Sequence, residues 1–104
     1  LSIGARLNAK LKDNVAIAKF THSGTQVIDW TPEGSPARSR NIYPRFIAFV
    51  RESMKELADK GHEVELAGVF YHLGENDMSF GPHRRNSPAW LQSTIAQTPR
   101  LAEV

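Results

Sequence analysis

Residues 64–80, VELAGVFYHLGENDMSF, decide the expected fold of this chain. The first half of the stretch is rich in β-branched and aromatic residues and carries almost no charge, a composition typical of a strand buried on both faces. The run ends abruptly in a polar cluster at residues 72–77, which contains one glycine. Because open α/β sheets bind ligands just past the carboxyl ends of their strands, this cluster is the first candidate for a functional site.

A second run of the same kind lies earlier in the chain. Residues 15–20, VAIAKF, are expected to form a mostly apolar strand, and the small polar residues 21–25, THSGT, follow it directly. Residues 2–12 carry apolar side chains at helical spacing and are expected to form a short helix. Residues 31–40 contain two prolines and a glycine, so they are expected to form a loop.

A long amphipathic helix is expected between the two strand-like runs. Asn41 is a suitable N-cap, and Pro44 falls in the first turn, where proline is tolerated. Gly61 is expected to end the helix at the C′ position. The apolar stripe of this helix comprises Ile42, Phe46, Ile47, Phe49, Val50, Met54 and Leu57.

A third helix is expected near the carboxyl end. Ser87 is a suitable N-cap, Pro88 would occupy the first helical position, and Thr98 with Pro99 would interrupt the helix. The order helix, strand, loop, helix, strand, loop, helix predicts a parallel sheet with right-handed crossovers. The expected fold class is therefore α/β.

Composition limits the function classes. The chain has 104 residues, 13 Lys+Arg, 11 Asp+Glu and a net charge of +2, with the charges interspersed, so no nucleic-acid partner is expected. No apolar run approaches the roughly 18 residues of a membrane span, so no membrane association is expected. There is no cysteine, and His22, His72 and His83 lack the spacing of a helical zinc pair, so no metal is expected. Because the first residue is Leu1 rather than an initiator methionine, we expect the chain to be a processed or excised piece.

The polar clusters resemble a known family. Residues 74–77, GEND, match the G-x-N-D block of the SGNH (GDSL-type) hydrolases, and residues 70–77, FYHLGEND, resemble the aromatic-HQGE-S/N-D signature of its sialate O-acetylesterase and carbohydrate-esterase branch. Residues 19–25, followed by Trp30, are similar to the K-aromatic-x-x-G-G-T…W segment of that branch. The resemblance covers roughly residues 1–97. It implies that residues 1–104 are the central part of a single SGNH-like domain.

The resemblance implies a three-layer α/β/α, flavodoxin-like serine esterase that removes acetyl groups from carbohydrates through an acyl-enzyme. Gly24, through its backbone N–H, and Asn76, through its side-chain amide, correspond to the oxyanion-hole residues of the family. Trp30, His72 and Glu75 are the candidates for contact with an acetylated carbohydrate substrate. No cofactor is implied, and a secreted or periplasmic location fits the family.

The departures from the family pattern are substantial. Leu73 stands where the branch has glutamine, and Ser23 replaces the first glycine of G-G-T. The serine block (G-D-S or G-Q-S) and the late D-x-x-H block are both missing. Asp59 and His62 match D-x-x-H literally, but they lie at the expected helix end, so we interpret them as helix-end residues. The chain alone is therefore expected to be inactive.

Other interpretations stay open. Asn76 could merely cap the turn after the strand, Gly24 could be a positive-φ turn residue, Glu75 could pair with an arginine or with backbone amides, and Trp30 could be a packing residue. The chain could also be a non-catalytic remnant that serves as a structural or binding module. In the family order, runs 15–20 and 65–71 flank an absent central strand and do not pair directly. Their exposed strand edges would then offer a surface for self-association.

Overall fold

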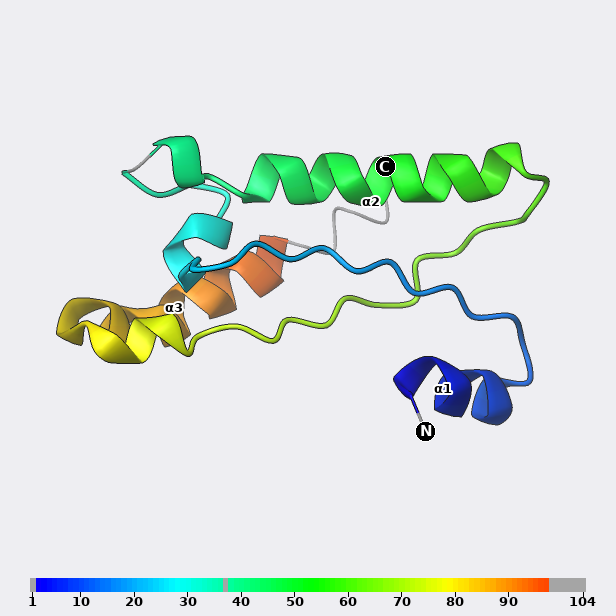
Figure 1. Ribbon diagram of the computed structural model, residues 1–104, viewed down its shortest axis with the longest axis horizontal. Coiled ribbons are helices and arrows are strands. Elements are labelled where there is room, and N and C mark those ends of the chain that lie inside the picture. Colours follow the sequence, from blue (N-terminus) through cyan, green and yellow to red (C-terminus); the bar gives the residue numbers. More distant parts are fainter. Residues whose placement is uncertain (1, 37, 98–104) are drawn as a thin grey trace.

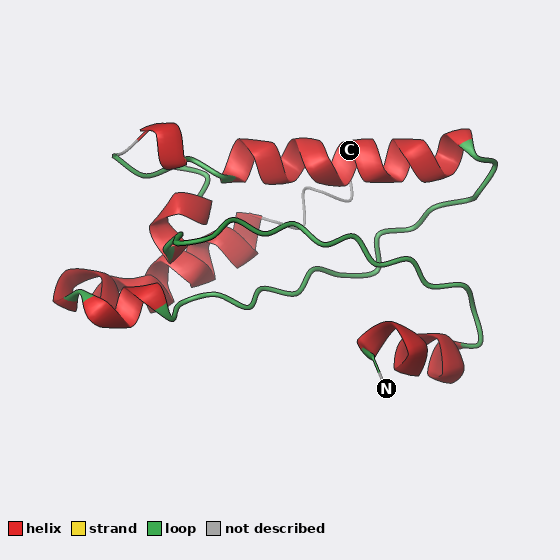
Figure 2. Ribbon diagram, viewed as in Figure 1, coloured by secondary structure: helices red, strands yellow, loops and turns green. Residues whose placement is uncertain are grey.

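The computed structural model describes residues 2–36 and 38–97, which form three α-helices and three short 3₁₀ helices (Figures 1 and 2). The elements are α1 (Ile3–Leu11), η1 (Val27–Trp30), η2 (Arg38–Arg40), α2 (Tyr43–Asp59), η3 (Asn76–Ser79) and α3 (Gly81–Gln97). Two long segments, residues 14–22 and 62–73, run in the same direction as extended chain below α2 in the view of Figure 1. None of the described helices is long and apolar enough to cross a membrane.

The expected α/β fold is wrong. The described residues contain no strand and no sheet, so this part of the chain is helical rather than a three-layer, flavodoxin-like structure (Figure 2). Residues 15–20 and 64–71 are extended, as their composition predicts, but a strand also needs a neighbouring strand to pair with. These two segments form no ladder with each other, and the sheet in which they were expected to flank a central strand is absent from the described residues.

Helices α1 and α2 confirm the first two helix predictions. In α1 the Ser2 hydroxyl oxygen accepts a hydrogen bond from the Ala5 N–H at 3.3 Å and caps the helix. The N-cap of α2 is Ile42 rather than the expected Asn41, whose side-chain oxygen instead accepts from the Ser35 N–H within the preceding loop. Residues 31–36 of that loop are irregular as expected, whereas Arg38–Arg40 form η2.

The end of α2 is formed as predicted. Gly61 has a φ of +91°, a conformation that glycine adopts without the steric cost of a Cβ. The Gly61 N–H donates to the Ala58 carbonyl at 3.0 Å, and the His62 N–H donates to the Leu57 carbonyl at 3.2 Å. These two bonds form a Schellman motif, which pairs the last carbonyls of the helix and directs the chain into the extended segment.

Helix α3 begins earlier than the sequence predicts. It starts at Gly81, so Ser87 is no N-cap and Pro88 lies inside the helix. Pro82 falls in the first turn, where its missing N–H costs nothing, and the Arg84 N–H donates to the Phe80 carbonyl at 2.9 Å. The expected interruption at Thr98 and Pro99 lies outside the described residues.

The apolar core is small and sits at the amino-terminal end of α2. Trp30, Ile42 and Phe46 are its buried members, and Phe20, Ile47, Val50, Leu66, Val69, Tyr71 and Leu73 pack around them half-buried. Farther along α2, Met54 and Leu57 of the predicted stripe are only half-buried. The radius of gyration is 15.5 Å, above the roughly 13 Å of a compact chain of this length, so the molecule is open.

Candidate functional site

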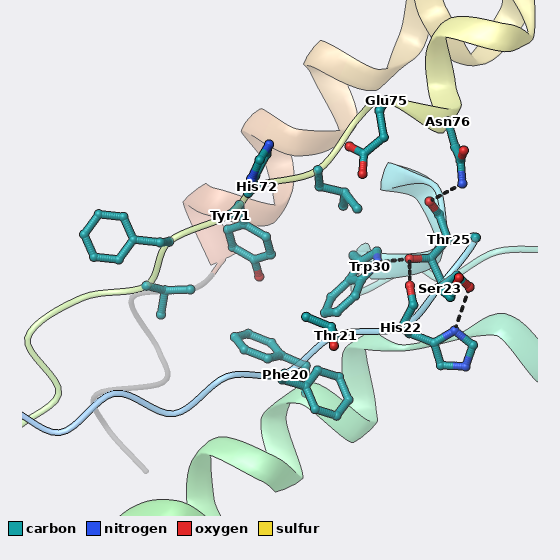
Figure 3. Close-up of a pocket in the computed structure, with 15 residues that line it drawn as sticks. Phe20, Thr21, His22, Ser23, Thr25, Trp30, Tyr71, His72, Glu75 and Asn76 are labelled. Atoms are coloured by element: carbon teal, nitrogen blue, oxygen red, sulfur yellow. Dashed lines mark hydrogen bonds between the residues drawn. The ribbon is translucent and has the colours of Figure 1, made fainter. Parts of the chain in front are cut away.

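The two polar clusters predicted from the sequence line one cavity of about 480 Å³ between the extended segments (Figure 3). Aromatic side chains form one part of its wall, because the Phe46 ring lies 6.1 Å from the Phe20 ring and 5.9 Å from the Tyr71 ring, centroid to centroid. Residues 21–25 and 72–76 contribute the polar part of the lining. The site therefore combines an apolar wall with a cluster of hydrogen-bonding groups.

A short hydrogen-bonded turn shapes the first cluster. Gly24 has a φ of +72°, which allows the chain to reverse into η1. The buried Thr25 hydroxyl donates to the His22 carbonyl at 2.9 Å and accepts from the Trp30 indole N–H, also at 2.9 Å. The Asp29 carboxylate accepts from the Gln26 N–H at 2.9 Å, which closes the first turn of η1.

The second cluster, at η3, is bonded directly to the first. The Asn76 side-chain amide donates to the Thr25 carbonyl at 3.3 Å, and the Asp77 carboxylate accepts from the Val27 N–H at 3.1 Å. Asp77 is fully buried, and Val27 is 2% exposed. Helix α3 packs against both η1 and η3 and so supports the junction. Two segments 50 residues apart in sequence are thus held at one end of the cavity.

Arg40 is a member of the cluster that the sequence did not indicate. Its guanidinium donates to the Gly24 carbonyl and forms an ion pair with the buried Asp29 at 3.3 Å. It reaches the site from η2, because the loop of residues 31–40 folds back beside η1 (Figure 1). No local sequence pattern predicts that this loop returns to η1. The hydrogen bond between Trp30 and Thr25 differs, because the two residues are close in sequence.

All five predicted site residues line the cavity, but they differ in exposure and bonding. The Asn76 amide is bonded to the carbonyl of Thr25, the residue that follows Gly24 in the chain (Figure 3). Trp30 lines the cavity but is only 7% exposed, so its ring is mainly a packing surface. His72 and Glu75 also line the cavity with exposed side chains (Figure 3), and Glu75 forms none of the ion pairs found among the described residues.

His22 and the residues of the D-x-x-H match make local contacts. His22 donates through Nδ1 to the main-chain carbonyl of Ser23 at 3.2 Å, not to its hydroxyl, so the two do not form a nucleophile–base pair. Asp59 pairs with Lys55 at 2.6 Å on the surface of α2, and His62 lies at the helix end, the position expected from the sequence. Among the described residues, no group of three or more His, Asp or Glu side chains could hold a metal ion.

Comparisons with known protein families, with characterised proteins and with solved structures returned no match to this chain. The resemblance to the SGNH hydrolases therefore stays a prediction that rests on the motifs of the sequence. What the chain can do is argued below from the geometry of the cavity and its two polar clusters.

Proposed function

We propose that the chain supplies the oxyanion-binding part of a carboxylic ester hydrolase that removes O-acetyl groups from carbohydrates. The observation that carries the proposal is the hydrogen bond from the Asn76 amide to the Thr25 carbonyl, which joins segments 51 residues apart next to Gly24. Ester hydrolysis develops negative charge on the carbonyl oxygen, and each well-placed donor there is worth about 3–4 kcal/mol. Gly24 and Asn76 are donors of the required kind.

The bonding of Asn76 suits this role. A side-chain amide has two N–H donors, and the bond to Thr25 uses one of them. That bond fixes the orientation of the amide, so the second N–H remains for a substrate oxygen at the cavity. The backbone N–H of Gly24 makes no hydrogen bond within the described residues and supplies a further donor. The aromatic wall beside them would pack against the apolar face of a sugar.

The chemical step requires two further groups. A serine hydroxyl adds to the acetyl carbonyl, a histidine accepts the serine proton and passes it to the leaving sugar oxygen, and water then releases acetate from the acyl-enzyme. His22 and Ser23 are not arranged for this step in the structure. The proposal therefore assigns the nucleophile and the base to residues beyond these 104, and the chain alone is expected to bind without turning over.

A second proposal is a non-catalytic structural or binding module. It is favoured by the bonds of Asn76 to Thr25 and of Asp77 to Val27, because both tie η3 to residues 25–27 and would be needed for structure alone. The two proposals differ in one property. An oxyanion site must bind a small tetrahedral anion at the cavity, whereas a purely structural junction has no reason to do so.

An NMR titration separates the two proposals. The ¹⁵N-labelled chain is titrated with methylphosphonate, a tetrahedral anion that resembles the ester transition state. We expect the Gly24 amide and the Asn76 side-chain amide to shift together and saturably, and Asn76→Ala to abolish the Gly24 response. Asn86→Ala, at an exposed position of α3, is the matched control and should leave the response intact. An unshifted Gly24 amide at high methylphosphonate would refute the oxyanion proposal.

A further inference from the structure

The cavity has a single formal charge among the described residues that line it. The Glu75 carboxylate supplies this charge, because no lysine or arginine is among those residues and the histidines are counted as neutral. Glu75 is exposed and forms none of the ion pairs found in the described part of the chain. The guanidinium of Arg40 bonds to the Gly24 carbonyl, but its ion pair with Asp29 offsets its charge. A positively charged ligand would therefore meet a carboxylate that has no cationic partner of its own.

Aromatic rings line the same cavity. Figure 3 shows the rings of Phe20 and Tyr71 and the carboxylate of Glu75 directed toward its interior. Phe20 and Tyr71 are half-buried, so part of each side chain stays accessible. Trp30 packs on Phe20 at an interplanar angle of 81°, and Phe46 packs on Tyr71 at 59°. The rings are thus inclined to one another rather than stacked, an arrangement that gives the cavity an aromatic wall with several orientations.

The carboxylate and the aromatic wall together favour one ligand chemistry. A cation within about 6 Å of a ring centroid is attracted by the negative charge of the ring face. A primary ammonium is strongly hydrated, whereas the methyl groups of a quaternary ammonium can pack on apolar surface while the charge is kept. The cavity volume of about 480 Å³ lies in the range of small-molecule sites.

We propose that the cavity binds a small quaternary ammonium compound. The rings of Phe20 and Tyr71 contact its methyl groups, and the Glu75 carboxylate supplies the opposite charge. The proposal concerns binding alone and does not depend on the ester hydrolase proposal, because a non-catalytic module would contain the same cavity. It also assigns Glu75 a ligand, which the ion pairs of the described residues do not.

The first experiment separates charge from apolar contact. The probes are choline and 3,3-dimethylbutan-1-ol, which have nearly the same shape although only choline is charged. Each is titrated into the ¹⁵N-labelled 104-residue chain while the Trp30 indole N–H is followed by NMR. Choline should shift this signal saturably, and its own N-methyl proton signal should move upfield because protons over ring faces are shielded. The neutral alcohol should bind at least about fivefold more weakly.

Substitutions then test the charge and the ring separately. Glu75→Gln removes the charge at an exposed position and should weaken choline binding about five- to tenfold while binding of the alcohol is unchanged. Glu52→Gln, at an exposed position of α2, is the matched control and should leave both affinities unchanged. Tyr71→Leu keeps an apolar side chain without the ring, so it should weaken choline binding more than alcohol binding. Tyr71→Phe keeps the ring and should bind choline as the unsubstituted chain does.

The outcomes are decisive in both directions, provided that circular dichroism shows the helices retained. Choline binding that depends on the charge of Glu75 and on the ring of Tyr71 supports the proposal. If Tyr71→Leu does not fold, the comparison of Glu75→Gln with Glu52→Gln decides alone. Equal affinities for choline and the alcohol, unchanged choline affinity in Glu75→Gln, or no saturable response to choline would each overturn it. The methylphosphonate titration follows different groups, so its result is distinguishable from any of these.

Discussion

Replacement of Asp77 should reveal how much the junction between η1 and η3 contributes to stability. Asp77 is fully buried, and its carboxylate accepts from the Val27 N–H at 3.1 Å through one oxygen and at 3.4 Å through the other. Asp77→Ala would leave this buried N–H without a partner. A hydrogen bond to a charged group contributes about 1.5–3 kcal/mol, so we expect the free energy of unfolding to fall by about 2 kcal/mol.

The assay is urea denaturation followed by tryptophan fluorescence, since Trp30 lies 7% exposed beside this junction. Asp77→Asn keeps one oxygen acceptor and should lose about half as much stability as Asp77→Ala. Asp59→Ala is the matched control, because Asp59 is 63% exposed and pairs with Lys55 on the surface of α2. It should cost less than about 0.5 kcal/mol. An Asp77→Ala variant no less stable than Asp59→Ala would refute the reasoning.

Three further predictions follow from individual residues. The chain alone should hydrolyse p-nitrophenyl acetate no faster than buffer, and turnover that survives repurification and disappears with a serine-directed inhibitor would contradict this. In a polypeptide that also carries the serine and histidine blocks, Asn76→Ala should lower kcat by roughly 10²–10³ with KM little changed, and unaltered kinetics would remove Asn76 from the oxyanion site. Gly61→Ala should cost about 1 kcal/mol by urea denaturation because of its positive φ, whereas Gly68→Ala, with no such φ and an open environment, should have little effect. Equal effects of the two glycine changes would contradict the C′ assignment.

Local signals in the sequence were sufficient for the helices that end in recognisable motifs. Ser2 caps α1, and Gly61 ends α2, because the groups that satisfy a helix end lie within a few residues of it. Helix α3 shows the limit of such signals. Ser87 and Pro88 form a good start motif, yet the helix begins at Gly81, where Pro82 can also occupy a first turn. Local sequence preference allows the helix to start at either Gly81 or Ser87. The packing of α3 against η1 and η3 fits the start at Gly81.

The absence of a sheet from the described residues could not be predicted from composition. The β-branched and aromatic runs correctly indicated extended backbone at residues 15–20 and 64–71. Whether extended backbone becomes a strand depends on a partner at the right distance, which is a property of tertiary structure. Here the carboxyl ends of the two runs line a cavity, and Phe46 contacts an aromatic side chain from each run. The two runs therefore do not pair with each other as strands.

The candidate site was foreseeable in part. The polar clusters around Gly24 and Asn76 stand out because each follows an apolar run, and the structure brings them together. Arg40 and Asp29 were missed, since their contact depends on the return of the loop of residues 31–40 beside η1. Asp77 was noticed only as the last residue of the G-x-N-D match, although its carboxylate makes the most buried bond between the two clusters.

The junction between the two clusters can be measured directly by NMR. The hydrogen bond from the Asn76 amide to the Thr25 carbonyl places the Asn76 side-chain protons close to the backbone of Thr25 and Gln26. We predict nuclear Overhauser effects between the Asn76 side-chain amide and the backbone protons of these two residues, absent in Asn76→Ala. A folded chain with the sequential contacts of α2 but no such contacts to Thr25 or Gln26 would show that the two clusters do not form one site.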